Sequence, residues 1–415
     1  MDRVIAAIES VLPADKMPVA LHEPSFGGNE WAYLKDCLDS TYVSYVGPYV
    51  NRFEGMLAEF TGARKAVAVV NGTAALHLAL LLAGVKRDDE VLTPALTFVA
   101  TANAVAYCGA VPHFVDSEER TLGLDPFKLK DYLKDITSDF SKPCVNKHTG
   151  RRIKAVIPMH AFGHPVDLDP LADLCREYDL ELIEDAAESL GSYYKGRHTG
   201  NDGKISILSF NGNKTITTGG GGAVITNDEA LGRAAKHLAS TAKKPHRWAY
   251  KHDEIGYNYR MPNVNAALGC AQMEGLPGLL ERKRRLSEAY RRAFAHLEGI
   301  SFFTEPAFAK SNYWLNVLLL EEACADRRDE LLKKTNEAGI MTRPAWTLLN
   351  RLPMFQDCPR MDLSCAESLE SRLINIPSSA FLGGGNARTK NMRSHRIARR
   401  IRPAVLAAQR NPERP

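Results

Sequence analysis

Short apolar segments alternate with helical segments between about residues 65 and 228, and this alternation constrains the fold more than any other feature of the chain. The first apolar segment, KAVAVV (65–70), is directly followed by NGTAALHLALLLAGV, which has the pattern of a helix. The further apolar segments of strand length are DEVLTP, VPHFVD, IKAVIP, LELIED, ISILSF and GAVITN. Strands separated by helices form a mostly parallel sheet with helices on both faces. The sequence therefore predicts an α/β fold with a mostly parallel central sheet.

The 415 residues are enough for two domains that share a large buried core. After GYNYRMPNV the pattern becomes helical, with Asn263 as the expected N-cap, and from about residue 275 a charged helix and a few strands indicate a smaller domain. The polar insert 138–152 is expected to be a loop or a hairpin. The expected parts are an N-terminal segment, a large domain, a small C-terminal α/β domain and a basic tail, at 1–30, 31–274, 275–387 and 388–415.

Composition and charge argue against several classes of protein. The net charge of +4 gives no case for nucleic acid, no run approaches the roughly 18 apolar residues of a membrane span, and we expect no signal peptide. The tail 388–415 carries nine Lys or Arg residues and one acidic residue; we expect a solvated extension, with contact to an anionic partner as the alternative. The eight cysteines lie scattered without a CxxC pair or nearby histidines at ligand spacing, which favours a reducing cytoplasm and no metal site.

Polar residues follow four of the expected strands, at 71–74, 93–98, 184–188 and 209–214. In an open parallel sheet, ligands bind outside the carboxyl ends of the strands, so these four segments are expected to meet at one site. Their agreement is stronger evidence for a site than any single motif.

Each segment taken alone has a second interpretation. Gly72 and Thr73 begin a helix, where free amide groups favour a phosphate, but Thr73 also suits a simple N-cap. Asp185 is costly to bury unless it faces a cation, and a structural salt bridge would satisfy it equally. Lys214 in NKT is similar to part of a nucleotide-binding phosphate loop, but residue 213 is Asn and the following TITTGGGGAVIT is strand-like. No GxGxxG follows the first strand, which disfavours a dinucleotide-binding fold.

Pyridoxal 5′-phosphate (PLP) accounts for all four segments together. It needs a lysine amine for a Schiff base, a phosphate site, a carboxylate opposite its pyridine nitrogen and a flat group on its ring. Lys214 would supply the amine, Asp185 the carboxylate and Phe98 the stacked ring. The glycines after Lys214 would let the backbone pass close to the cofactor, where a Cβ would intrude. The expected phosphate ligands are Ser209, the Thr73 hydroxyl and the amides of Gly72, Thr73 and Ala74.

The motifs that carry these residues resemble those of the DegT-type sugar aminotransferases, PLP enzymes of the aspartate aminotransferase fold. The resemblance extends from about Pro24 to Ser379, and its motifs are GPYVNRFE, NGTAAL, TPALTFVATANA, GAVPHFVD, EDAAES, SFNGNKTITTGGGG, GYNYRMPNVNAALG and GIMTRPAW. It implies the same roles for Lys214 and Asp185, with pyridoxamine phosphate as the intermediate form of the cofactor. Asn258 resembles the residue that reaches the phosphate of the neighbouring subunit's cofactor. The resemblance thus implies a homodimer with shared active sites, although a plain turn residue is the alternative for Asn258.

Glu188 stands where many members of this family carry Gln or His near the cofactor's hydroxyl, and it is similar to members that aminate 4-keto-6-deoxy sugars. The segments TLGLDP, CVNKHTGRRIKA and 343–379 resemble the aminotransferases of legionaminic-acid-type pathways. That resemblance implies glutamate as the amine donor and a nucleotide-linked 2-acetamido-4-keto-2,6-dideoxy hexose as the acceptor. His160 is expected to be a hydrogen-bonded structural histidine. Candidates for sugar or diphosphate contact, each equally explained by packing or a surface ion pair, are Tyr42, Ser44, Tyr45, Arg343 and Trp346.

Three other functions stay open on the sequence. A related subgroup removes a sugar hydroxyl with the same cofactor but carries histidine in place of the lysine, and Lys214 argues against it. An amino-acid aminotransferase of the same fold is the second alternative. The third is a cofactor-binding regulatory or interaction protein that acts through its basic tail.

Overall fold

The structure is a computed structural model that describes residues 1–13, 17–137 and 143–384. Residues 1–383 form one compact unit. The expected basic tail, 388–415, lies outside the described residues, as does part of the polar insert. The described part of that insert turns back on itself, with Val145 paired to Arg152 in an antiparallel bridge, as expected for a hairpin.

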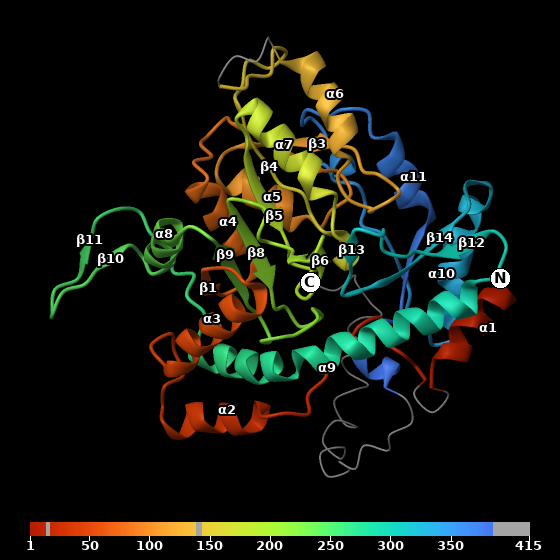
Figure 1. Cartoon of the computed structure of the whole chain (residues 1–415), viewed down its shortest axis with the longest axis horizontal. Helices are drawn as coiled ribbons and strands as arrows, with labels where there is room; N and C mark the ends of the chain where they lie inside the picture. Colours follow the sequence, from red (N-terminus) through yellow and green to blue (C-terminus); the bar gives the residue numbers. More distant parts are fainter. Residues whose placement is uncertain (14–16, 138–142, 385–415) are drawn as a thin grey trace. The chain divides into compact units, whose positions relative to one another are not determined.

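A seven-stranded sheet in the order β1-β9-β8-β5-β4-β2-β3 forms the centre of this unit (Figure 1). Its strands are β1 (Lys65–Val69), β2 (Glu90–Pro94), β3 (Val111–Val115), β4 (Ile153–Val156), β5 (Glu181–Asp185), β8 (Ile205–Ser209) and β9 (Gly222–Thr226). All neighbours from β8 to β3 are parallel, whereas β9 is antiparallel to both β1 and β8. The expected mostly parallel sheet is confirmed, and its last expected strand is the one that runs in reverse.

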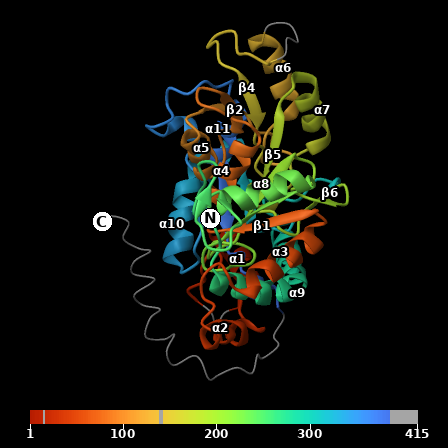
Figure 2. The same ribbon diagram turned by 90° about the vertical axis from the view of Figure 1, so that its left-hand side faces the viewer.

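Helices cover both faces of this sheet because its apolar side chains alternate between the faces. The α-helices of the described residues are α1 (Asp2–Val11), α2 (Glu30–Asp39), α3 (Pro48–Thr61), α4 (Gly72–Leu82), α5 (Ala100–Tyr107), α6 (Pro126–Ile136), α7 (Leu168–Tyr178), α8 (Glu229–Ala239), α9 (Asn263–Phe294), α10 (Arg328–Glu337) and α11 (Ser364–Arg372). In β1, Val67 and Val69 pack in the core with α4, while Ala66 and Ala68 pack with α3 on the other face. Figure 2 shows α5 on one side of β4 and β5 and α7 on the other.

The long helix α9 joins the two expected domains. Figure 1 shows it running past the central sheet, with α2 beside it and α1 near its C-terminal end. The boundary expected at residue 275 therefore falls inside one continuous helix, and the division into domains stays a prediction. The expected cap at the start of α9 is wrong: Pro262 is the N-cap, and the Asn263 side chain instead binds the carbonyl of Tyr42 and the amide of Tyr49.

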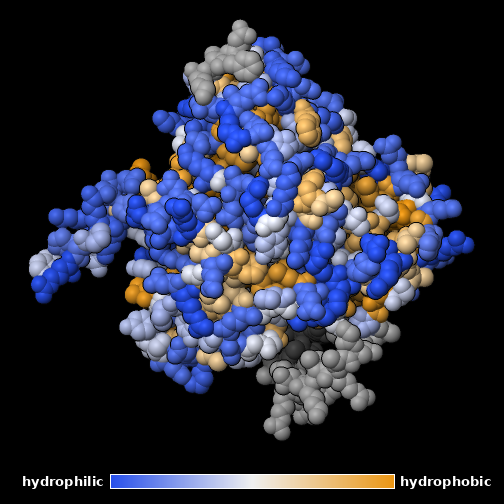
Figure 3. Space-filling view, viewed as in Figure 1, coloured by the Kyte–Doolittle hydropathy of each residue, from blue (hydrophilic) through white to orange (hydrophobic). Residues whose placement is uncertain are grey.

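A second, antiparallel sheet follows α9 in the order β12-β14-β16-β15. Its strands are β12 (Ile300–Phe302), β14 (Asn316–Leu320), β15 (Arg343–Pro344) and β16 (Leu373–Ile376). The remaining short strands are β6 (Tyr193–Tyr194), β7 (Arg197–His198), β10 (Lys243–Lys244), β11 (Lys251–His252) and β13 (Ala309–Lys310). The β10–β11 hairpin projects from the body, and polar side chains cover most of the face seen in Figure 3. None of the helices in the described part of the chain is long and apolar enough to cross a membrane.

Candidate active site

The carboxyl ends of β5 and β8 meet the start of α4 at one edge of the central sheet. A Cβ built on Gly72 would stand 3.0 Å from Cβ of Ser209, so the turn into α4 touches the end of β8. Asp185, the last residue of β5, accepts a hydrogen bond from Thr101 in α5, which follows β2. Lys214, beyond β8, lies within 3.1 Å of Glu188, beyond β5. These contacts bring residues of all four expected segments, or their direct continuation, to one place.

The turn from β1 into α4 offers fewer amide groups than the sequence suggested. Asn71, not Thr73, is the N-cap of α4, because its Oδ1 accepts a hydrogen bond from the Ala74 amide at 2.7 Å. The Ala74 amide is thereby bound within the helix cap, which disfavours the phosphate contact expected of it, and that contact stays a prediction. The amides of Gly72 and Thr73 are the ones left at the helix N-terminus, where the helix dipole favours an anion. Among the described residues, the Thr73 hydroxyl has no hydrogen-bond partner.

Gly222, the first residue of β9, touches this turn. A Cβ at this position would lie 2.5 Å from the carbonyl carbon of Asn71 and 2.7 Å from the amide nitrogen of Gly72. Both are backbone atoms, which cannot move aside as a flexible side chain can. The last of the four glycines after Lys214 thus lets β9 approach the turn that carries the Gly72 and Thr73 amides, and the close passage beside the cofactor stays a prediction.

Gly222→Ala should therefore damage the turn, whereas Gly220→Ala should not, because a Cβ on Gly220 would meet only the Val70 carbonyl oxygen, at 3.9 Å. We expect Gly222→Ala to lower the free energy of unfolding by about 1–3 kcal/mol and to weaken PLP binding. Thermal unfolding and PLP titration of both variants measure this. Equal PLP affinity in the two variants would contradict a phosphate site at the turn.

Lys214 is held at the sheet edge by a carboxylate and an aromatic ring. Its side chain is 13% exposed, and its Nζ lies 3.1 Å from Oε1 of Glu188 and 3.9 Å from the ring centroid of Trp314. The second carboxylate oxygen of Glu188 accepts the amide of Phe162 at 2.8 Å. Burial raises the pKa of Glu188, and the positive charge of Lys214 opposes that rise. The amine therefore lies in a mostly buried site, paired with Glu188 alone among the carboxylates of the described residues.

Asp185 is a buried carboxylate with few donors around it. Thr101 Oγ1 donates to its Oδ2 at 2.8 Å, and the Ala187 amide donates to its Oδ1 at 3.2 Å. Burial raises the pKa of Asp185 despite these two hydrogen bonds and the charge of Lys214. Such a carboxylate is stabilised by a further cation placed against it.

The sequence analysis missed the residues that support Lys214 and Glu188 from the segment just before β14. Asn312 is buried, and its side chain donates to the carbonyl of Glu188 and accepts the amide of Trp314. Trp314 in turn donates its indole Nε1–H to the carbonyl of Asn213 at 2.7 Å. The only signal for them is the segment SNYWLN itself, which combines polar and aromatic residues just before an apolar strand.

Two other residues from the sequence analysis lie beside this site. Phe98 follows β2 and is a 51% exposed residue, which leaves it accessible for stacking. His160 is fully buried, with Nε2 3.0 Å from Oε2 of Glu184, and is a hydrogen-bonded structural histidine as expected. Glu184 also accepts the amides of Gly200 and Gly203, so this pair holds the loop before β8.

The candidates for substrate contact differ in their surroundings. Trp346 stacks on Phe162, with ring centroids 4.7 Å apart, and Phe162 is the residue whose amide binds Glu188. Arg343 is exposed and its guanidinium lies near Asn336 instead. Asn258 is exposed and accepts a hydrogen bond from Arg260, so its contact with a partner subunit stays a prediction. Tyr42, Ser44 and Tyr45 lie exposed in the loop before α3.

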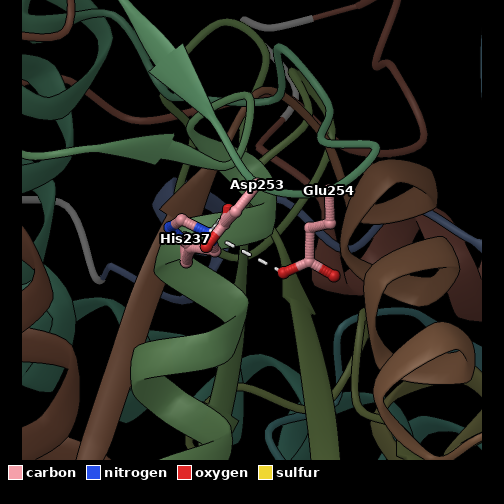
Figure 4. A group of neighbouring side chains, drawn as sticks. All are labelled: His237, Asp253 and Glu254. Atoms are coloured by element: carbon pink, nitrogen blue, oxygen red, sulfur yellow. Dashed lines mark hydrogen bonds and ion pairs between the residues drawn. The ribbon is translucent and has the colours of Figure 1, made fainter.

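Among the described residues, one group has the composition of a metal site: His237 of α8 with Asp253 and Glu254 after β11 (Figure 4). His237 Nε2 lies 2.7 Å from Asp253 and 3.7 Å from Glu254. The ammonium of Lys244 stands 3.3 Å from the other oxygen of Asp253. A cation is thus already paired there, and ion pairs that fasten the β10–β11 hairpin to α8 explain the group.

The residues at the sheet edge fit PLP. The backbone of Gly222 packs directly against the turn from Asn71 to Gly72. The amides of Gly72 and Thr73, which have no partner among the described residues, and the hydroxyls of Thr73 and Ser209 lie at this turn, which suits a phosphate. The Asp185 carboxylate is buried and accepts only two hydrogen bonds from the described residues, so a protonated pyridine nitrogen would stabilise its charge. Lys214 presents an amine whose ion-pair partner within the described part of the chain is Glu188.

Comparison with known proteins agrees with this geometry. The DegT/DnrJ/EryC1/StrS aminotransferase family matches residues 24–389. EpsN of Bacillus subtilis (strain 168), assigned as a pyridoxal phosphate-dependent aminotransferase, is 41% identical over 366 residues, which are 87% of this chain and 91% of EpsN. GDP-perosamine synthase of Escherichia coli O157:H7 is 39% identical over 360 residues, 87% of this chain and 93% of that enzyme. The structure of the aminotransferase TlmJ from Streptoalloteichus hindustanus superposes with a TM-score of 0.78 at 28% identity, over 88% of this chain and 94% of TlmJ.

Proposed function

Because this chain belongs to the DegT/DnrJ/EryC1/StrS aminotransferase family, we propose that it transfers an amino group from glutamate to the 4-keto carbon of a nucleotide-linked 4-keto-6-deoxy hexose. It is a PLP-dependent aminotransferase with the fold of that family. The observation that carries the proposal is the Lys214–Glu188 pair, 3.1 Å apart and almost dry at the edge where Asp185 ends β5. The relative that makes GDP-perosamine supports a nucleotide-linked sugar as the acceptor.

Each residue of the site has a part in this reaction. Bound PLP supplies an aldehyde that condenses with amines and a ring that takes up the electrons of a broken Cα–H bond. Lys214 would hold the cofactor between turnovers and, once free, would take the proton from Cα of glutamate and deliver a proton to C4 of the sugar. Asp185 holds positive charge at the pyridine nitrogen, and Glu188 receives the Lys214 amine.

The remaining ligands orient the cofactor. The amides of Gly72 and Thr73, with the hydroxyls of Thr73 and Ser209, bind the phosphate, and Phe98 packs on the ring. Holding the cofactor in one orientation would keep the reacting groups within reach of the Lys214 amine.

The acceptor within this class is proposed to be a 2-acetamido-4-keto-2,6-dideoxy hexose of a legionaminic-acid-type or surface-polysaccharide pathway. This rests on the segments TLGLDP, CVNKHTGRRIKA and 343–379, together with Glu188. Trp346 and Phe162, stacked next to the Glu188 carboxylate, are the proposed wall on the sugar side.

One assay tests the function and separates its rivals. Purified, PLP-loaded protein is incubated with glutamate and a panel of UDP- and GDP-linked 4-keto-6-deoxy sugars, and products are identified by mass and by the configuration at C4. We expect one sugar to gain an amino group while 2-oxoglutarate appears. Loss of a hydroxyl without gain of nitrogen would indicate a dehydratase, and turnover with keto acids alone would indicate an amino-acid aminotransferase.

The active unit is proposed to be a homodimer that works in the cytoplasm, in which Asn258 reaches the cofactor phosphate of the other subunit. Exposed aromatic side chains of the β10–β11 hairpin, Trp248 and Tyr250, support a protein contact at this projection. All eight cysteines are free thiols, which suits a reducing compartment. A solution mass of a single chain in the active protein would remove the dimer from the proposal.

A further inference from the structure

Lys283 is a buried amine in α9 whose partners come from three separate parts of the chain. Its Nζ lies 2.7 Å from the carbonyl oxygen of Ser378, 3.1 Å from that of Trp314 and 3.0 Å from Nε2 of His22. The residue is 1% exposed. The three hydrogens of the ammonium are thereby matched by three acceptors, and none of these acceptors is a carboxylate.

Burying Lys283 and His22 destabilises the folded state more than burying two apolar side chains would. Burial lowers the pKa of Lys283 to about 7. A charged Lys283 can only donate to Nε2 of His22, and the neutral imidazole then carries its proton on Nδ1, which is buried and has no hydrogen-bond partner among the described residues. A buried ammonium and an unsatisfied N–H both cost free energy that an apolar pair would not.

Trp314 connects this pair to Lys214. Its carbonyl is held by Lys283, and its indole N–H is held by the carbonyl of Asn213, the residue before Lys214. The indole ring lies under the Lys214 amine, 3.9 Å from centroid to Nζ. His22 is close enough to both amines that, after burial, the charges of Lys283 and Lys214 lower its pKa well below the ordinary value.

We propose that Lys283 and His22 are positioning residues for the Lys214 amine and that they act through Trp314. This inference rests on the role proposed for Lys214. Lys283 fixes the backbone of Trp314, the indole then fixes one of the two places at which the Lys214 amine docks, and Glu188 is the other. The Lys214 amine leaves the cofactor and returns to it in each turnover. The indole of Trp314 and the carboxylate of Glu188 must therefore keep fixed positions, because a small misplacement of a reacting group lowers the rate.

The test uses PLP-loaded protein and the variants Lys283→Met, His22→Leu and His22→Gln. Glutamine keeps an acceptor oxygen for Lys283, and leucine does not. We expect Lys283→Met and His22→Leu to lower kcat about 10- to 100-fold with little change in KM, and His22→Gln to restore most of the rate. Without any substrate, the pH midpoint of the absorbance change of the lysine-linked cofactor should shift by about half a unit or more in the two damaged variants.

Tyr290→Phe is the matched control, because Tyr290 lies on the same helix and donates one buried hydrogen bond to the carbonyl of Pro377, next to Ser378. It should lower the melting temperature and leave kcat and the pH midpoint unchanged. If Lys283→Met behaves in the same way, its role is structural and the proposal is overturned. If Lys283→Met does not fold, equal rates and equal midpoints in His22→Leu and His22→Gln overturn it. Failure of the proposed sugar reaction is distinguishable, since the absorbance midpoint requires no sugar.

Discussion

Lys214→Ala is expected to abolish turnover and the visible absorbance band of the lysine-linked cofactor. The substitution removes the amine that binds PLP and the base that moves the proton, so we expect at least about a 10⁴-fold loss of kcat. Activity with glutamate and the best sugar of the panel, and the absorption spectrum after adding PLP, measure the two effects. The phosphate ligands at Gly72, Thr73 and Ser209 are untouched, so PLP should still bind without its covalent link.

Lys204→Ala is the matched control for this result. Lys204 precedes β8 as Lys214 follows it, but its side chain is 39% exposed and pairs with Glu181 at 2.8 Å. The control should keep both the absorbance band and the rate. Transamination that persists in Lys214→Ala would remove the assignment of the lysine and, with it, the proposed mechanism.

The central sheet could be predicted because each strand is a short apolar run that is buried on both faces. The antiparallel direction of β9 could not be predicted, because GAVIT is equally apolar in either direction. The conformation of the preceding TITTGGGG segment determines that direction. The start of α4 shows a second limit. Asn71 and Thr73 both suit an N-cap, and only the observed bond from the Ala74 amide to Asn71 decides between them.

The site could be predicted as far as it follows the strand ends. Glu188 and Lys214 sit directly after strands, and a rule about sheet edges places them together. Asn312, Trp314 and Lys283 come from beyond the large sheet's strands and reach Lys214 only through tertiary packing. No spacing in the sequence indicates these contacts, so the residues that support Lys214 could not be predicted.

Asp185→Ala is expected to change activity and stability in opposite directions. Without the carboxylate, positive charge at the pyridine nitrogen is no longer stabilised as the Cα–H bond breaks, and kcat should fall about 10²- to 10³-fold. In cofactor-free protein, burial raises the pKa of Asp185, so the folded state keeps a proton that the unfolded state releases. The free energy of unfolding of the wild type then falls as the pH rises from the ordinary aspartate pKa to the raised pKa of Asp185. Above the raised pKa, the wild type is destabilised by the whole free energy of burying the charged carboxylate.

The alanine variant buries no charged carboxylate, so cofactor-free Asp185→Ala should melt at the same or a higher temperature than the wild type at neutral pH. The difference between the two melting temperatures should become smaller as the pH is lowered. Adding PLP should stabilise the wild type more than the variant, because only the wild type offers the buried carboxylate a cation. Asp173→Ala, at an exposed aspartate of α7 that pairs with Arg176, should change neither quantity. A normal rate in Asp185→Ala, or equal stabilisation of both proteins by PLP, would mean that this carboxylate faces something other than the pyridine nitrogen.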